Sequence, residues 1–282
     1  MLRLSGGMAE FSKGQRSIAR YITGHYEKAA YITANRLGEN AGVSESTVVR
    51  FAVELGYEGY PQMQRALRES IRSRLTSVQR IEVAEDRLAG RGVPQMVLNS
   101  DMDNIRKTLE GLDREEFAKA VESILGARRI YILGVRSSSA LAGFMSFYFH
   151  LLFENVKLVN TTSASEMFEQ VLRVDENDVV IGISFPRYSR RTVKVMQYAR
   201  DRGARVIAIT DNVNAPPAQA ADMTLPAVCD MTSFVDSLAA PLSLINALVV
   251  ALGMRKKTEI QGTFARLEQI WEDYEVFQQA ER

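Results

Sequence analysis

Five short apolar runs alternate with helical stretches between residues 130 and 226, and this pattern constrains the fold most strongly. The runs have the length of strands buried on both faces and cover 130–135, 156–160, 178–184, 204–210 and 222–226. Helical periodicity separates them at 139–153, 164–173, 190–203 and, more weakly, 215–221. Strands that alternate with helices predict an α/β domain with a five-stranded parallel sheet, doubly wound and in the flavodoxin-like order 2-1-3-4-5.

An all-α segment precedes this domain, and within it residues 33–60 predict two short helices that meet at a tight turn. Thr33 can cap the first helix, and Gly42 can end it because glycine adopts a positive φ without steric cost. Ser44 can cap the second helix. In a helix-turn-helix the outward positions meet bases and phosphates. The candidate DNA-binding residues are Arg36, Ser44, Glu45, Ser46, Thr47 and Arg50. An ordinary helical hairpin with a polar outer face is the alternative.

The charge is balanced over the whole chain but not along it. The 282 residues have a formal net charge of +1 and suffice for two ordinary domains. Residues 1–80 carry twelve basic and seven acidic side chains, a balance of +5, and the remainder therefore sums to −4. A basic head on an acidic body suits a protein that docks one end on a polyanion, although a solvated arginine-rich helix face gives the same count.

Residue usage argues against several other classes of protein. A single cysteine, Cys229, excludes an internal disulfide, and two histidines argue against a metal cluster, so no metal and no cofactor are expected. The first twenty residues lack a secretion signal, and charges interrupt every long apolar run. These features predict a cytoplasmic protein that does not span a membrane.

The periodicity also predicts the remaining organisation. Residues 1–76 form the helical head, 77–112 a helical linker, 113–255 the α/β domain and 256–282 an amphipathic C-terminal helix. Helical periodicity runs through 98–125, and a very apolar helix is expected over 236–253. The C-terminal helix carries apolar residues at Ile260, Phe264, Leu267, Trp271 and Tyr274.

Two loops of the predicted sheet have the composition of an anion site. In the order 2-1-3-4-5, ligands bind beyond the carboxyl ends of the first and third strands. Hydroxyls and guanidinium groups crowd both loops, and each loop precedes a helix N-terminus, where free amides favour anions. Serine is also the usual helix cap, so a single serine decides little. The candidates are Gly134, Arg136, Ser137, Ser138 and Ser139 in the first loop, and Ser184, Arg187, Ser189 and Thr192 in the second.

Both halves of the chain resemble known domains. Residues 11–70, with RLGENAGVSESTVVRFAVELGYEGY, resemble the helix-turn-helix domain of the RpiR/MurR transcriptional regulators. Residues 115–253, with YILGVRSSS, VVIGISFPRYSRRT and ARVIAITD, resemble a SIS (sugar isomerase) domain. The resemblance implies a dimeric or tetrameric regulator whose SIS domain senses a phosphosugar. By position, Ser138 matches the serine of the first phosphate loop, Ser184 opens the second loop and Ser189 closes it.

The sequence departs from these families in the two loops. Many family members have glycine where this chain has Arg136, and Pro186 and Arg187 replace the usual Ser-Gly. We expect a ligand with more negative charge than a monophosphosugar, such as a sugar acid phosphate or a bisphosphate. Alternatively, the two arginines pair with local carboxylates such as Glu166 or Glu169.

The sequence therefore predicts a transcriptional regulator that is not an enzyme. Its expected partners are double-stranded operator DNA, an anionic small-molecule effector and further copies of itself in a homodimer or homotetramer. The main alternative is an aldose–ketose phosphosugar isomerase, for which Glu166 is the best candidate base. Glu166 also belongs to the expected ligand site, where it follows the second strand. A third possibility is an adaptor whose helical head binds another protein.

Overall fold

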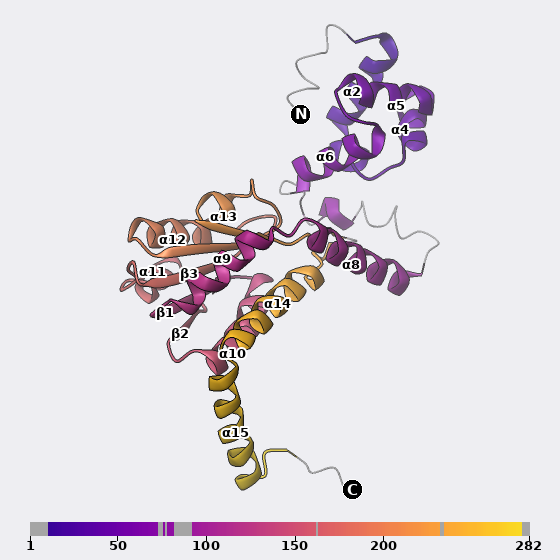
Figure 1. Cartoon of the computed structure of the whole chain (residues 1–282). Coiled ribbons are helices and arrows are strands. Elements are labelled where there is room, and N and C mark those ends of the chain that lie inside the picture. The colour runs from indigo at the N-terminus through magenta and orange to yellow at the C-terminus, as the bar shows by residue number, and fades with distance from the viewer. Residues whose placement is uncertain are drawn as a thin grey trace, which may run out of the picture. The chain divides into compact units, whose positions relative to one another are not determined.

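The computed structural model describes residues 11–72, 76, 78–81, 92–161, 163–231 and 234–277, with Glu69, Ile71 and Arg72 described by their backbone alone. The chain divides into two compact units (Figure 1). The first comprises residues 1–96 with 231–235, and the second comprises 97–230 with 236–282.

The first unit is a bundle of short helices around one apolar cluster. The helices are α2 (Lys13–Gly24), α3 (Tyr26–Ala29), α4 (Ala34–Ala41), α5 (Glu45–Glu54) and α6 (Tyr60–Arg72). The cluster includes Ile18 and Ile22 of α2, Leu37 of α4, and Val48 and Phe51 of α5, all fully buried. Burial of this single face holds helices that are too short to be stable alone.

The caps and turns of this unit follow the sequence signals. The hydroxyls of Thr33 and Ser44 accept hydrogen bonds from the backbone at the first turns of α4 and α5. Gly42 ends α4 in the left-handed conformation with φ 68°. The helix-turn-helix expected at 33–60 is therefore confirmed as a local fold.

Tyr60 ties α6 to the segment before α4. Its hydroxyl donates a hydrogen bond to the Ile32 carbonyl at 2.8 Å. Burial raises the pKa of Tyr60 to about 12, and the phenol therefore stays protonated as a donor at neutral pH.

The second unit is built on a five-stranded sheet in the order β2-β1-β3-β4-β5, in which every neighbouring pair is parallel. The strands are β1 (Arg129–Gly134), β2 (Val156–Val159), β3 (Asp178–Ile183), β4 (Arg205–Thr210) and β5 (Met223–Pro226). Each strand begins and ends within one residue of its expected bounds. The predicted sheet order is confirmed.

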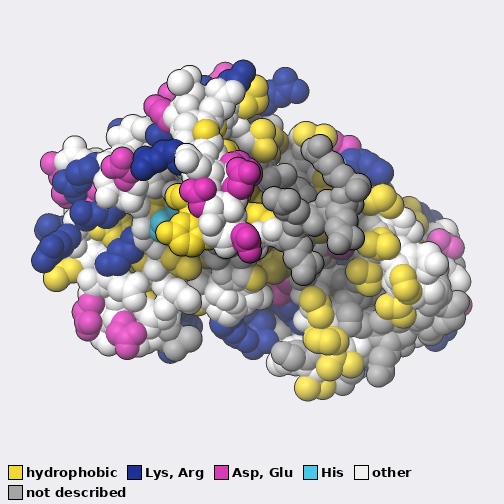
Figure 2. All heavy atoms as spheres, turned by 90° about the horizontal axis from the view of Figure 1, so that it is seen from below, with side chains coloured by type: hydrophobic (Ala, Val, Ile, Leu, Met, Phe, Trp, Pro, Cys, Tyr) yellow, Lys and Arg dark blue, Asp and Glu magenta, His cyan; other side chains and the backbone are white. Residues whose placement is uncertain are grey.

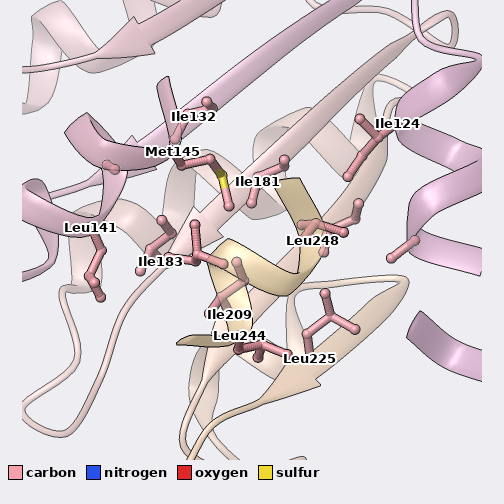
Figure 3. Packing of buried hydrophobic residues seen from close by; sticks show 14 of the residues in the cluster. Ile124, Ile132, Leu141, Met145, Ile181, Ile183, Ile209, Leu225, Leu244 and Leu248 are labelled. Atoms are coloured by element: carbon pink, nitrogen blue, oxygen red, sulfur yellow. The ribbon is translucent and has the colours of Figure 1, made fainter. Parts of the chain in front are cut away.

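Helices cover both faces of this sheet. The helices that follow the head are α8 (Val93–Glu110), α9 (Arg114–Leu125), α10 (Ser138–Leu152), α11 (Ala164–Gln170), α12 (Arg190–Asp201), α13 (Pro216–Gln219), α14 (Ala239–Arg255) and α15 (Lys257–Asp273), of which α15 packs on α10 and α14. On one face, α9, α10 and α14 pack on alternate strand residues such as Ile132, Ile181 and Ile209 (Figure 3). On the other face, α11 and α12 pack on Tyr131 and Leu133.

The helical periodicity expected over 98–125 is divided between two helices, α8 and α9. Asp113 caps α9 by accepting hydrogen bonds from two backbone amides, and this cap starts a new helix after the break at Gly111. Leu98 and Leu109 of α8 are 62% and 71% exposed. The buried side chains of α8 include Asn104 and Thr108, which bond to the backbone of Asp230 and Val228.

The apolar side chains of the C-terminal helix α15 lie near the surface in the described part of the chain. Helix α15 has no fully buried side chain; Phe264 and Tyr274 are exposed, and Ile260 is half-buried. Hydrophobic side chains reach the surface between charged groups on one face of the molecule (Figure 2). No single described helix is long and apolar enough to cross a membrane, and only the pair α14 and α15, bent by 98°, passes on length and composition.

Candidate functional site

The sheet order creates a switch point between β1 and β3. The chain leaves β1 through α10 and continues to β2, whereas it leaves β3 through α12 and continues to β4 on the opposite side. Helices α10 and α12 also cover opposite faces of the sheet. The loops that leave β1 and β3 therefore diverge at adjacent strand ends, which is where open α/β sheets bind ligands.

The first loop makes a tight turn onto α10. A Cβ on Gly134 would lie 2.6 Å from the Ser138 carbonyl oxygen and 2.9 Å from the Ala142 Cβ, so only glycine fits there. Arg136 is exposed and holds a left-handed backbone with φ 56°. Its carbonyl accepts a hydrogen bond from the Ser139 hydroxyl at 2.6 Å. Ser137 precedes α10 and makes no side-chain cap, while the Ser139 amide donates a hydrogen bond to the Arg136 carbonyl at 3.0 Å.

The second loop is held together by its serines. The hydroxyl of Ser184, only 3% exposed, accepts a hydrogen bond from the Ser189 backbone amide at 3.1 Å. Ser189 then caps α12 by accepting from the Thr192 amide at 3.2 Å. Between them, Arg187 is exposed and also left-handed, with φ 65°. Both loops thus present an arginine on the backbone conformation that glycine normally adopts.

Tyr188 anchors the second loop to the end of the neighbouring strand. Its hydroxyl donates to Asp211 Oδ1 at 2.7 Å, and Thr210 donates to the same oxygen at 3.3 Å. The sequence did not predict this contact, because nothing in the spacing of the loop and of β4 indicates which side chains meet.

Thr192 has a buried hydroxyl that makes no hydrogen bond to any residue in the described part of the chain. A buried hydroxyl without a partner destabilises a fold. We expect Thr192→Val to raise the free energy of unfolding of the ligand-free protein by about 1 kcal/mol, measured by chemical denaturation. The control is Thr210→Val, which is equally buried but removes a hydroxyl that has a partner, and should lower it. A loss of stability in Thr192→Val would contradict this explanation.

Glu166 lies at the same edge of the sheet, in the first turn of α11 after β2. It is exposed, and its carboxylate accepts a hydrogen bond from the Thr161 hydroxyl. Within the described ranges no ion pair joins Arg136 to Glu166 or Glu169. A carboxylate at a helix N-terminus is stabilised by the helix dipole, so this position needs no catalytic explanation.

In the helical head, the DNA-binding candidates fall into two groups. The Ser44 hydroxyl is engaged as the α5 cap and lies 2.9 Å from the hydroxyls of both Ser46 and Thr47. Arg50 stays on the outer face, with its Nε donating to the Ser46 carbonyl at 3.3 Å, and Glu45 is exposed beside them. Arg36 lies on α4 instead, in an exposed ion pair with Glu39 at 2.7 Å.

Gly38 is required by the fold of this head and was not among the residues expected to be important from the sequence. It sits inside α4, and a Cβ there would lie 2.7 Å from the Val43 carbonyl oxygen and 3.2 Å from the Ser44 carbonyl carbon. The backbone of the turn therefore crosses α4 at this residue. The glycine itself could have indicated this contact, because glycine destabilises a helix interior and is therefore retained there for a packing or functional reason.

Comparisons with known proteins agree with this two-part arrangement. Residues 2–74 match the helix-turn-helix domain of the rpiR family, and residues 123–251 match the SIS domain. The chain belongs to the RpiR-type transcriptional regulators. Similar relatives include an HTH-type transcriptional regulator of Caldanaerobacter subterraneus subsp. tengcongensis, 24% identical over 89% of both chains. Another is the regulator HexR of Pseudomonas aeruginosa, 24% identical over 95% of this chain and 93% of HexR.

Two solved structures share the fold of this regulator. The sugar isomerase domain of an RpiR transcription factor from Sphaerobacter thermophilus has a TM-score of 0.61 and 24% identity, covering 64% of this chain and 99% of that domain. The Vibrio vulnificus NanR protein complexed with ManNAc-6P has a TM-score of 0.60 and 20% identity, covering 97% of this chain and 98% of NanR. These two structures show that the fold of this chain is one already seen in solved proteins.

Proposed function

We propose that this regulator binds operator DNA through α5 and changes its operator affinity when an anionic sugar derivative binds the switch-point loops. The observation that carries the proposal is the pair of loops 134–139 and 184–192, which leave adjacent strands, are rich in hydroxyls and arginines, and each lead into a helix N-terminus. Free amides, hydroxyls and guanidinium groups are the donors that bind phosphate and carboxylate.

The ligand class follows from the charge of the loops. NanR, which shares the fold, was solved with a phosphorylated amino sugar, and this supports a phosphosugar as the core of the ligand. Arg136 and Arg187 add two cations at exposed positions. The ligand therefore carries a second anionic group, as a sugar acid phosphate or a sugar bisphosphate does. Ser138, Ser184 and Ser189 contribute hydroxyls around the first phosphate, whereas the hydroxyl of Thr192, also expected in this site, is buried beneath the loop.

The DNA contacts follow from the outward face of the head. Arg36 and Arg50 bind phosphates, which fixes the register without reading sequence, while Ser46 and Thr47 contact bases or phosphates beside Glu45 and the Ser44 cap. Two heads of a homodimer or homotetramer in the cytoplasm contact half-sites of a near-palindromic operator. The effector shifts operator affinity because it binds two arrangements of the subunits unequally.

The chain has no catalytic role in this proposal. The relatives are named transcriptional regulators, and Glu166 is an exposed carboxylate at a helix N-terminus. Incubation of the protein with aldose and ketose phosphates tests the alternative directly. Steady isomerisation that scales with protein concentration would establish an isomerase and overturn this part of the proposal.

Operator binding and effector binding are tested together. A binding site is first selected from random duplexes with the full-length protein, and its affinity is measured by fluorescence anisotropy. A thermal-shift panel of sugar monophosphates, sugar bisphosphates and phosphorylated sugar acids then identifies ligands, since a ligand at 100 times its Kd stabilises the fold by about 2.7 kcal/mol. We expect at least one doubly anionic compound to raise Tm and to change operator affinity. A regulator that binds duplexes but responds to no compound in the panel would contradict the proposed effector class.

A further inference from the structure

The outward face of α5 carries two valines that the fold of the head does not use. Val49 and Val53 are 39% and 54% exposed, whereas Val48, Phe51 and Ala52 of the same helix are fully buried. Neither exposed valine belongs to the hydrophobic cluster beneath the helix. A single exposed apolar residue needs no explanation, but these two are one turn apart on the helix that the fold presents for DNA.

The valines alternate with polar groups along one stripe. Ser46, Val49, Arg50 and Val53 are spaced i, i+3, i+4 and i+7, so they line one face of α5. Arg50 and Ser46 are exposed, and the Arg50 Nε contacts the Ser46 carbonyl rather than an acidic side chain. A hydroxyl, a cation and two methyl-bearing side chains therefore face the same way.

The charge of the head favours duplex DNA as the occupant of this stripe. Residues 1–80 have a balance of +5, and Arg50 lies between the two valines on the stripe. The major groove offers a single apolar group to a side chain, the C5-methyl of thymine, beside acceptors that suit Arg and Ser. Branched aliphatic side chains match that methyl in size and polarity.

We infer that Val49 and Val53 read thymine methyl groups and are specificity determinants of the operator half-site. The inference rests on the proposed operator binding by α5. Four residues advance a helix by about 6 Å, and successive base pairs rise by about 3.4 Å. Where α5 runs along the floor of the groove, this places the two thymines about two base-pair steps apart, on either strand of the half-site.

Uracil replacement tests this inference at the level of one methyl group. In a site selected with the full-length protein, each thymine is replaced in turn by uracil, which removes the methyl and keeps the base pair. We expect affinity to fall about fourfold at two positions in each half-site, the change that burial of one methyl group gives. Val49→Ala should abolish the loss at one position, and Val53→Ala should abolish it at the other.

Two controls separate the possible outcomes. Alanine is the best helix former, so both variants should keep the helix, and their circular dichroism and Tm confirm this. Val250→Ala removes a valine that is 53% exposed on α14 and should leave every thymine-to-uracil effect unchanged.

Equal affinity for thymine and uracil at every position would overturn the inference while leaving operator binding intact. A protein that selects no duplex at all would instead overturn the proposed function. If Val53→Ala weakened all duplexes equally and shifted the subunit equilibrium in sedimentation, the stripe would be a contact between copies of this chain, and the inference would be wrong.

Discussion

Replacement of Gly38 by valine is expected to abolish operator binding while leaving effector binding intact. The added Cβ would lie 2.7 Å from the Val43 carbonyl oxygen, which belongs to the backbone and cannot rotate away. The turn cannot move outward without loss of the 2.9 Å hydrogen bond from the Val43 amide to the Gly38 carbonyl. Overpacking of this kind costs about 3 kcal/mol, a large part of the stability of a small helical head.

The measurement separates the two units of the chain. Operator affinity is followed by fluorescence anisotropy, and effector binding by calorimetry on the same preparation. The second unit has its own apolar clusters on both faces of the sheet, so its ligand affinity should stay within about twofold of the parent protein. A variant that loses both activities would show that Gly38 acts on more than the local turn.

Gly24 provides a matched control within the same domain. It ends α2, is exposed, and a Cβ there would meet no atom within 4 Å. Gly24→Val should therefore change stability by no more than about 0.5 kcal/mol and leave operator affinity unchanged. Equal damage from both substitutions would rule out the close approach at Gly38 as the cause.

Sheet order and strand bounds could be predicted from the sequence because the strands are buried on both faces. A continuous run such as 178–184 has few other folds available, and short loops with helical crossovers leave few topologies. The end of α4 was equally predictable, since Gly42 adopts a conformation that other residues rarely take.

Features that depend on tertiary contacts could not be predicted from periodicity or turn residues. The apolar period of α8 suggested a buried face, yet Leu98 and Leu109 are exposed and Asn104 is buried against the backbone of Asp230. Periodicity identifies an apolar stripe but does not say what covers it. Gly38 and the Tyr188–Asp211 contact were missed for the same reason, since both depend on segments that meet only in the folded chain.

The two candidate ligand loops were predictable in position but not in backbone conformation. Their positions at the ends of β1 and β3 followed from the strand order alone. The left-handed backbones of Arg136 and Arg187 did not follow, because arginine carries no signal for a positive φ. Backbone strain at a proposed binding site allows a test that separates two effects. Replacing a strained arginine by glycine relieves the backbone and removes the charged side chain, so stability and ligand affinity can change in different directions.

Arg136→Gly and Arg187→Gly are each expected to weaken effector binding by about ten- to a hundredfold, and Arg136→Gly should do so without lowering stability. A hydrogen bond to a charged group contributes about 1.5 to 3 kcal/mol, which corresponds to that loss of affinity. In the ligand-free protein, glycine relieves a left-handed conformation that costs other residues about 1 kcal/mol, and this gain offsets the added freedom of the unfolded chain. Calorimetry with the tightest compound of the panel measures affinity, and chemical denaturation measures stability.

Glu275 offers the matched control for the backbone effect, because it is the other described non-glycine residue with a positive φ, at 51°. Glu275→Gly relieves the same conformation far along the chain from both loops and should leave effector affinity unchanged. A second control compares the affinities of each variant for ligands that differ in charge. If the arginines bind a second anionic group, both variants should lose more affinity for a bisphosphate than for the matching monophosphate. An equal loss for both compounds would mean that the arginines shape the loops rather than select the ligand, and the doubly charged effector would then be wrong.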